Sequence, residues 1–329
     1  MTLLLTEDDA KKLTSVTAAI PTIEEAFRIL GNRRAYTPPR ERMPTGFDGQ
    51  HYHEGFLQLG PAAMPTKNLA GYKMFANFGS RDLKVRYGRA WNYLFDLRTG
   101  ELLGIFQAHF LSNARTAATS GVAAKYLSPS SASTVGLFGP GKLAEGQLEA
   151  ICAVRAIKQA FIHGRNKDKC DAFAKEAGKR FEIDVSSVDR PEDAAAADII
   201  ITCTSSFEPI FFGDWLKKPG LLIGVGANHW NRRELDESVF KKADLIVADE
   251  RETAKVESGA LKSAVHNGII TWDKVENLAD IVAGRLPFTD FDKSTTVFCS
   301  HGLALEDVAI SAQVYEEARR SGVGRDIDV

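Results

Sequence analysis

The chain has 329 residues, of which 44% are hydrophobic, and its formal net charge is −2. This length suffices for about two domains with full hydrophobic cores. The small net charge argues against binding through a bulk field to nucleic acid or to an anionic membrane. The acidic start, Glu7-Asp8-Asp9, is untypical of a signal peptide, and no apolar run approaches the roughly 20 residues of a membrane helix.

Four cysteines are scattered along the chain and form no C-x-x-C pair: Cys152, Cys170, Cys203 and Cys299. They fall in segments that we expect to be helix or strand. We therefore interpret them as reduced core residues of a cytoplasmic protein, with a reactive thiol as the alternative.

The first third of the chain indicates an α+β domain. Thr22 and Glu25 have the spacing of a capping box, which predicts a helix that begins after Pro21 and ends at Gly31. Strand-like runs follow at Gly55–Leu59, Leu69–Phe78, Ala90–Asp96 and Leu102–Ala108, with a hairpin turn at Arg98–Glu101 between the last two. These runs predict a largely antiparallel sheet.

A helix over Asn113–Leu127 is expected to lead into a second domain. An amphipathic helix over Ala304–Arg320 is expected to return to the first domain. The predicted division is therefore 1–115 with 304–329 for a substrate and dimerisation domain, and 116–303 for a dinucleotide-binding domain.

A glycine-rich turn follows the apolar run Thr134–Phe138. Gly139-Pro140-Gly141-Lys142-Leu143-Ala144 has the pattern G-x-G-x-x-A. Gly139 permits the tight turn, Gly141 lets the backbone approach a pyrophosphate, and Ala144 lets the next helix pack closely on the strand. That helix, expected over Pro140–Ile157, directs its unpaired N–H groups at the phosphates. We predict a dinucleotide-binding turn.

The rest of this half alternates apolar runs with helical segments. The further runs are Ala160–His163, Asp198–Cys203, Gly220–Val225, Asp244–Ala248 and Thr295–Cys299. Such alternation predicts a Rossmann-type doubly wound parallel sheet, with ligand at the carboxyl ends of the strands.

The loop after the second of these runs bears on the choice of nucleotide. NAD-preferring sites usually place an acidic residue there, about 20 residues after the glycines, to bind the ribose 2′-OH. Here the loop carries Arg165, Asn166 and Lys167 instead. The two cations suit a 2′-phosphate, so we favour NADP(H), with NAD(H) as the alternative. A solvated basic loop without a role is the other interpretation.

Several segments resemble the ornithine cyclodeaminase/mu-crystallin family over nearly the whole chain. They are Ser112–Gly121 with its Arg115-Thr116-Ala117-Ala118, Thr202–Ser206 with Pro209, Gly226–His229 with Arg233–Asp236, and Phe298–Ala304 with Asp307. The family includes amino-acid cyclodeaminases, alanine dehydrogenases, ketimine and cyclic-imine reductases, iminosuccinate reductase and hormone-binding mu-crystallins. The resemblance also implies a homodimer joined through the sheet of the first domain.

The resemblance implies that Arg40, Lys73 and Arg115 bind a substrate carboxylate. A guanidinium can grip a carboxylate with two parallel hydrogen bonds, and a lysine adds a point charge or a proton. Without the resemblance, we would favour Lys73 as a lysine on the solvent side of an alternating strand, and the alternative for the two arginines is a surface ion pair. Arg42 competes with Arg40 for the role.

The resemblance implies roles for residues of the second domain as well. His301 is a second candidate proton donor after Lys73 or a bound water, or else it only shapes the nicotinamide pocket. Thr204 and Ser205 are expected to line the cofactor, with Pro140, Lys142 and Leu143 in the glycine turn. Ser300 and Gly302 are expected near the nicotinamide.

Two departures from the family narrow the chemistry. Cyclodeaminases carry aspartate at the position of Asn228 and glutamate at the position matched to Gln58, and an amide cannot act as a general base. We therefore predict reduction of the C=N bond of a small carboxylated imine, of ketimine or iminosuccinate type, rather than cyclodeamination. The alternatives are a reversible amino-acid dehydrogenase that uses ammonia and a 2-oxo acid, and a mu-crystallin-like NADP-dependent binding protein.

A compact histidine cluster, His51-Tyr52-His53-Glu54, raises the question of a metal. No third ligand pattern accompanies it, so we expect no metal site.

Overall fold

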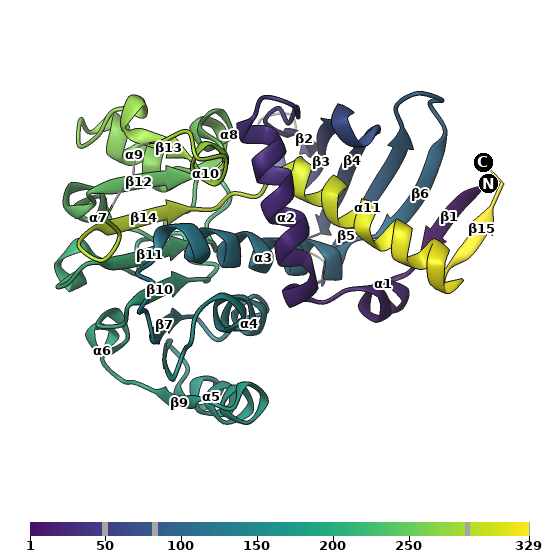
Figure 1. The fold of residues 1–329 in the computed structure, drawn as a ribbon. Coiled ribbons are helices and arrows are strands. Elements are labelled where there is room, and N and C mark those ends of the chain that lie inside the picture. Colours follow the sequence, from purple (N-terminus) through teal and green to yellow (C-terminus); the bar gives the residue numbers. More distant parts are fainter. Residues whose placement is uncertain (48–51, 81–84, 287–289, 329) are drawn as a thin grey trace. The chain divides into compact units, whose positions relative to one another are not determined.

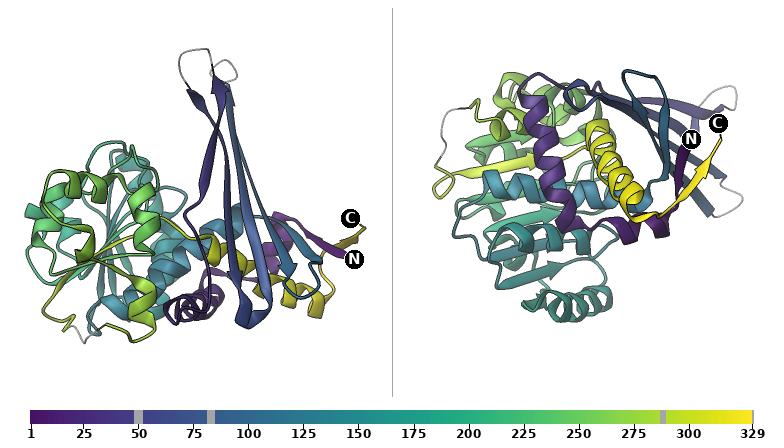
Figure 2. Two further views of the ribbon diagram at one scale, coloured as in Figure 1. Left: turned by 90° about the horizontal axis from the view of Figure 1, so that it is seen from above. Right: turned by 45° about the vertical axis from the view of Figure 1, so that its right-hand side comes forward.

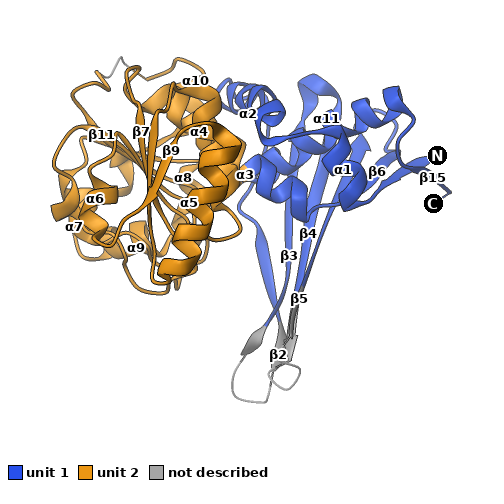
Figure 3. Cartoon of the chain, turned by 90° about the horizontal axis from the view of Figure 1, so that it is seen from below, with its two compact units in different colours: residues 1–115, 303–329 blue, residues 116–302 orange. Residues whose placement is uncertain are grey.

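The computed structural model describes residues 1–47, 52–80, 85–286 and 290–328. The chain forms two compact units (Figure 3): unit 1 consists of Met1–Arg115 and Leu303–Val329, and unit 2 of Thr116–Gly302. Helix α3 (His109–Leu127) contributes residues to both units. Among the described residues, no helix is long and apolar enough to cross a membrane.

Unit 1 is built on a seven-stranded sheet with the order β15-β1-β6-β5-β4-β3-β2 (Figure 1). Its strands are β1 (Thr2–Leu5), β2 (Glu41–Phe47), β3 (Tyr52–Met64), β4 (Leu69–Ser80), β5 (Val85–Asp96), β6 (Leu102–Gln107) and β15 (Arg325–Ile327). Every neighbouring pair is antiparallel except β1 and β6. The largely antiparallel sheet is confirmed, and the pairing of β1 with β15 brings the two chain ends together.

One face of this sheet carries the helices of unit 1. These are α1 (Glu7–Leu13), α2 (Val16–Gly31) and α11 (Ala304–Ser321), with a short 3-10 turn η1 (Pro65–Lys67) between β3 and β4. Helix α11 packs against α2 and against β3, β4 and β5 (Figure 2). The core below it contains Leu94 and Phe106 from the strands and Ile23 and Phe27 from α2. The expected helix over Ala304–Arg320 is thus confirmed.

The predicted start of α2 is wrong. The helix begins at Val16, where the side chain of Ser15 accepts the backbone N–H of Ala18, and it continues through Pro21. Thr22 is not a cap. The apolar spacing on one face runs unbroken across Pro21, and burial of that face outweighs the single backbone hydrogen bond that a proline removes.

Unit 2 is built on an eight-stranded sheet with the order β13-β12-β14-β11-β10-β7-β8-β9, and every neighbouring pair is parallel. Its strands are β7 (Thr134–Phe138), β8 (Gln159–His163), β9 (Asp184–Ser187), β10 (Ile199–Thr202), β11 (Gly220–Gly224), β12 (Leu245–Ala248), β13 (Val275–Asn277) and β14 (Thr295–Cys299). The predicted Rossmann-type parallel sheet is confirmed.

Helices lie on both sides of this sheet (Figure 3). They are α4 (Ala144–Val154), α5 (Lys167–Phe181), α6 (Pro191–Ala195), α7 (Glu237–Lys242), α8 (Arg251–Glu257), α9 (Gly259–His266) and α10 (Leu278–Val282), with 3-10 turns η3 (Gly213–Trp215) and η4 (Trp272–Lys274). Helix α4 is shorter than the expected Pro140–Ile157 at both ends: it begins after the glycine turn of residues 139–143, and it ends at Val154 because Arg155 is extended.

Strand β7 lies at the point of the sheet where the order of successive strands changes direction. Strands β8 and β9 extend on one side of it, and β10 and β11 on the other. In doubly wound sheets, ligands bind outside the carboxyl ends of the strands at this reversal. Phe138, the last residue of β7, is anchored there by Phe211, whose ring centroid lies 5.2 Å away. The fold therefore presents the glycine turn at the edge where a ligand is expected.

Candidate active site

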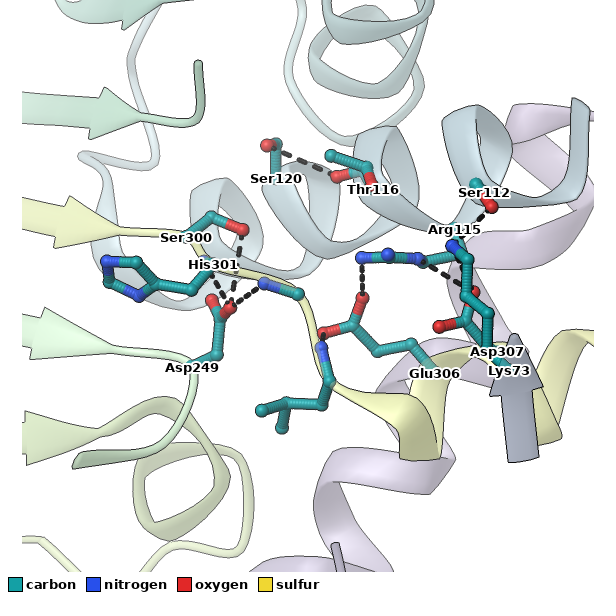
Figure 4. A network of polar contacts seen from close by, with 12 residues as sticks. Lys73, Ser112, Arg115, Thr116, Ser120, Asp249, Ser300, His301, Glu306 and Asp307 are labelled. Atoms are coloured by element: carbon teal, nitrogen blue, oxygen red, sulfur yellow. Dashed lines mark hydrogen bonds and ion pairs between the residues drawn. The ribbon is translucent and has the colours of Figure 1, made fainter. Parts of the chain in front are cut away.

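Lys73 in unit 1 is buried, with only 8% of the residue exposed. It lies on β4, on the sheet face that α11 covers, and its Nζ donates to Ser112 Oγ at 2.5 Å and to Asp307 Oδ1 at 3.2 Å (Figure 4). The interpretation of Lys73 as a solvent-facing lysine is therefore wrong. A buried ammonium needs such partners, because its desolvation is costly.

The surroundings of Lys73 make its proton labile. Burial lowers the pKa of Lys73 from its usual 10.5 to about 8; Asp307 opposes this change, whereas Arg115 and Arg40 add to it. A group with a pKa near the working pH is suited to donate a proton during a reaction.

Arg115, on α3, is buried and bound to two carboxylates of α11. Its Nη1 donates to Glu306 Oε2 at 2.9 Å and its Nε to Asp307 Oδ1 at 3.2 Å. Asp307 Oδ1 thus accepts from both Lys73 and Arg115 (Figure 4). The alternative interpretation of Arg115 was a surface ion pair. Arg115 does form ion pairs, but they are buried.

The other two candidate arginines, Arg40 and Arg42, lie at the start of β2. Arg40 is half-buried just before β2, and its positive charge helps to lower the pKa of Lys73. Arg42 donates from Nε to Oε1 of the buried Gln58 at 2.8 Å, and its guanidinium lies 5.5 Å from the centroid of Phe56. Because Arg40 is an electrostatic neighbour of Lys73, it is the better candidate for a substrate carboxylate.

The glycine turn in unit 2 has the geometry of a dinucleotide cradle. Gly139 has a φ of +99°, and a Cβ there would lie 2.7 Å from Thr204 Cγ2, so the turn itself requires glycine. At Gly141 a Cβ would approach no described atom more closely than Cys203 O, at 3.9 Å. A side chain at the exposed Gly141 would therefore point into open space, which leaves room for a pyrophosphate.

Helix α4 begins directly after this turn. Its N-cap residue is Leu143, whose side chain has no hydrogen-bond acceptor. The first backbone N–H groups of the helix are therefore not capped by the side chain at the N-cap. Ala144 is completely buried, as the motif predicts, whereas Gly141 and Lys142 are exposed. Together these features fit a phosphate group bound at the start of α4.

The basic loop after β8 is only partly available for a 2′-phosphate. Asn166 caps α5 by accepting Lys169 N, and Lys167 is paired with Asp189 at 2.8 Å. Arg165 is exposed, and the preceding Gly164 packs on Pro140 of the glycine turn. Arg165 is therefore the residue of this loop best suited to bind a nucleotide phosphate.

Two further loops follow β10 and β11. Thr204 is half-buried and Ser205 exposed after β10, while Asn228 is exposed after β11. Glu234, which belongs to the Arg233–Asp236 motif but has no predicted role, is buried between these loops. It accepts the backbone N–H groups of Thr204 and Gly226.

A second buried carboxylate, Asp249, organises the loop after β14. Its Oδ2 accepts the backbone N–H groups of His301 at 2.6 Å and of Gly302 at 2.5 Å, and the hydroxyl of Ser300 at 3.5 Å (Figure 4). His301 is buried, with 4% of the residue exposed. The predicted residues Ser300, His301 and Gly302 therefore share one carboxylate as their hydrogen-bond acceptor.

The histidine cluster that raised the metal question falls outside what the structure describes. His51 is not described, and neither are the side chains of His53 and Glu54. Within the described residues, no group of three or more His, Cys, Asp and Glu side chains is arranged to hold a metal ion.

The fold defines a two-unit protein whose second unit is of Rossmann type. The model of the ornithine cyclodeaminase/mu-crystallin family matches residues 1–322, and the chain belongs to this family.

Three relatives illustrate the similarity. The Δ(1)-pyrroline-2-carboxylate reductase of Thermococcus litoralis, solved with NADH and L-proline, has a TM-score of 0.91 and 31% identity over 99% of this chain and 100% of that one. An archaeal alanine dehydrogenase dimer with bound NAD has a TM-score of 0.91 and 30% identity over 99% of both chains. The iminosuccinate reductase of Paracoccus denitrificans is 27% identical over 99% of this chain and 100% of the relative. These relatives are oxidoreductases that act on C=N or CH–NH groups.

Proposed function

We propose that this protein is an NAD(P)H-dependent reductase that converts a small carboxylated imine into an amino acid. The observation that carries the proposal is Lys73, a buried lysine whose pKa is lowered to about 8 and whose neighbours include Arg115 and Arg40. This cluster offers an anion-binding site and a labile proton together. The family relatives named above include two imine reductases.

The chemistry divides between the two units. In unit 2, Gly139, Gly141 and the start of α4 would hold the pyrophosphate, with Thr204, Ser205, Ser300 and Gly302 around the rest of the dinucleotide. When bound, the reduced dinucleotide supplies a hydride for the imine carbon.

The residues of unit 1 handle charge and protons. Arg40 and Arg115 bind and orient the substrate carboxylate, and Asp307 keeps Lys73 and Arg115 in place. Lys73 gives its proton to the imine nitrogen and is re-protonated from solvent between turnovers. His301 is the second candidate donor, and the exposed amide of Asn228 can hydrogen-bond the substrate nitrogen without accepting its proton.

The reversible amino-acid dehydrogenase is the competing function, favoured by the likeness to the archaeal alanine dehydrogenase. Ammonia separates the two. An imine reductase oxidises NAD(P)H with a preformed cyclic ketimine and needs no ammonia, whereas a dehydrogenase needs ammonia together with a 2-oxo acid. A mu-crystallin-like binding protein would bind the dinucleotide and turn over neither mixture.

We further propose a preference for NADPH that depends on Arg165. Replacing Arg165 with alanine should lower the ratio of kcat/KM for NADPH to that for NADH by about 10-fold, because a charge-assisted hydrogen bond to the 2′-phosphate is lost. The control is Lys169→Ala, an exposed cation on the first turn of α5, which should leave the ratio unchanged. Equal losses with both nucleotides in Arg165→Ala would refute the preference.

We propose a homodimer formed through the open face of the unit 1 sheet. Residues that alternate with Lys73 and Asn92 point away from α11, and they include Tyr72, Trp91 and Tyr93, all partly exposed. The rings of Tyr72 and Tyr93 are stacked, with centroids 4.6 Å apart. Such an aromatic face is typical of a subunit interface, and the archaeal alanine dehydrogenase is a dimer. Sedimentation velocity would show the dimer; a monomer at all concentrations would rule it out.

We infer a cytoplasmic location from the four free cysteines, of which Cys170, Cys203 and Cys299 are buried, since reduced thiols are typical of that compartment. We also propose that unit 1 is the substrate and dimerisation domain and unit 2 the dinucleotide-binding domain.

A further inference from the structure

Glu234 joins two loops at the carboxyl edge of the unit 2 sheet. The first, the β10 loop, comprises residues 203–206, and the second, the β11 loop, comprises residues 225–228. Glu234 Oε1 accepts Thr204 N at 2.5 Å, and Oε2 accepts Gly226 N at 2.7 Å and Thr202 Oγ1 at 3.1 Å. With 1% of the residue exposed, Glu234 has these three donors in place of water.

The two loops also touch each other directly. A Cβ at Gly226 would lie 2.2 Å from Thr204 O and 2.7 Å from Glu234 Cδ, so no side chain fits between the loops. Thr204 in turn packs on Gly139, because a Cβ placed at Gly139 would lie only 2.7 Å from Thr204 Cγ2. Contact is therefore continuous from the glycine turn through Thr204 and Glu234 to Gly226, two residues before Asn228.

Glu234 is itself held firmly. Its backbone oxygen accepts Ile210 N at 2.8 Å and Phe211 N at 3.0 Å, and the next residue, Leu235, is buried in the core. Burial raises the pKa of Glu234, and the hydrogen bonds from Thr204, Gly226 and Thr202 oppose that rise. A buried carboxylate is costly to desolvate, and the donors of the two loops offset that cost.

We propose that Glu234 is a positioning residue that sets the β11 loop, with Asn228, in register with the cofactor-lining β10 loop. The proposal rests on the proposed function, because it assigns the cofactor to the β10 loop and the substrate nitrogen to the β11 loop. Glu234 touches neither ligand and acts through the backbone of both loops. Its loss should therefore weaken cofactor binding and imine turnover together.

The test compares two carboxylate-to-amide variants of the same sheet. Glu234→Gln keeps the size of the side chain but turns one acceptor into a donor that faces a backbone N–H. Asp198→Asn makes the corresponding change at the amino edge, where Asp198 Oδ2 accepts the N–H groups of Ser133 and Thr134 at 3.0 Å each. Both changes should lower Tm, but only the first lies beside the proposed site.

For Glu234→Gln we expect kcat/KM for a cyclic ketimine to fall about 10- to 100-fold and the Kd for NAD(P)H, from fluorescence titration, to rise about 5-fold or more. Asp198→Asn should leave both quantities within about twofold of wild type at a temperature below either melting transition. The proposal is overturned if Glu234→Gln loses no more activity and affinity than Asp198→Asn.

The outcome also separates this proposal from the proposed function. If the wild-type protein binds NAD(P)H but reduces no imine, the proposed function fails, and the Kd values of the two variants still decide whether Glu234 positions the β10 loop. If the wild-type protein binds no dinucleotide, both proposals fail. A normal Kd in Glu234→Gln with lowered kcat/KM would also contradict the coupling of the two loops.

Discussion

Replacing Lys73 with alanine is expected to lower kcat/KM for imine reduction about 1,000-fold, because general acid catalysis typically contributes factors of 10² to 10⁴. The Kd for NAD(P)H should stay near the wild-type value, since Lys73 belongs to unit 1 and the glycine turn to unit 2. Steady-state kinetics and fluorescence titration measure the two quantities. Activity within about threefold of wild type would rule out Lys73 as the proton donor.

A matched control lies on the turn that leads into the same strand. Lys67→Ala removes an exposed lysine of η1 and should leave kcat/KM within about twofold of wild type. The comparison separates the chemistry of the buried lysine from a general effect of lost positive charge on unit 1.

The pH profile provides a second check on Lys73. The competent form for reduction is the protonated ammonium, and its pKa of about 8 lies well below the usual 10.5. The ionisation of Lys73 should therefore leave kcat/KM constant below about pH 8. Above about pH 8, kcat/KM should fall as Lys73 loses its proton. A fall at the same pH in Lys73→Ala would assign the titration to the substrate or to another residue.

Replacing Gly141 with valine is expected to weaken NAD(P)H binding about 30-fold or more, because the new side chain fills the space proposed for the pyrophosphate. The fold should tolerate the change, since a Cβ there lies 3.9 Å from the nearest described atom, Cys203 O. Thermal unfolding should show a Tm close to that of wild type. Wild-type affinity in Gly141→Val would contradict the placement of the pyrophosphate.

Gly139→Ala is the contrasting variant. The φ of +99° at Gly139 and the 2.7 Å approach to Thr204 Cγ2 mean that any side chain strains the turn itself. We expect this variant to lower Tm by several degrees, for a cost of about 1–2 kcal/mol, in addition to any loss of affinity. The pair therefore distinguishes a glycine needed by the ligand from one needed by the fold.

Six of the eight strands described in unit 2 were predictable because each is a short apolar run, whereas the polar edge strands β9 (Asp184–Ser187) and β13 (Val275–Asn277) were not predicted. β7 (Thr134–Phe138) and β14 (Thr295–Cys299) coincide with their predicted ranges. β15 (Arg325–Ile327) was not predicted, because it exists only through pairing with β1 and has no apolar pattern of its own. The start of α2 was missed because Pro21 is typical of a first turn, whereas tertiary burial extends the helix beyond it.

The candidate site shows a similar division. The glycine turn is local, so its pattern was sufficient to predict it. The burial of Lys73 depends on Asp307, which is 234 positions away in the sequence. The alternation of β4 alone does not predict whether Lys73 faces the helices or solvent. The contact of Glu234 with Thr204 joins residues 30 positions apart, and no spacing rule predicts it.

The most direct test of the proposed function is the oxidation of NADPH and NADH, followed by absorbance, with a panel of cyclic ketimines and imino acids, with and without added ammonia. We predict oxidation with a preformed carboxylated imine, at a rate that ammonia does not raise. Oxidation only with a 2-oxo acid and ammonia would favour the amino-acid dehydrogenase, and no oxidation with any member of the panel would contradict the assignment as a reductase.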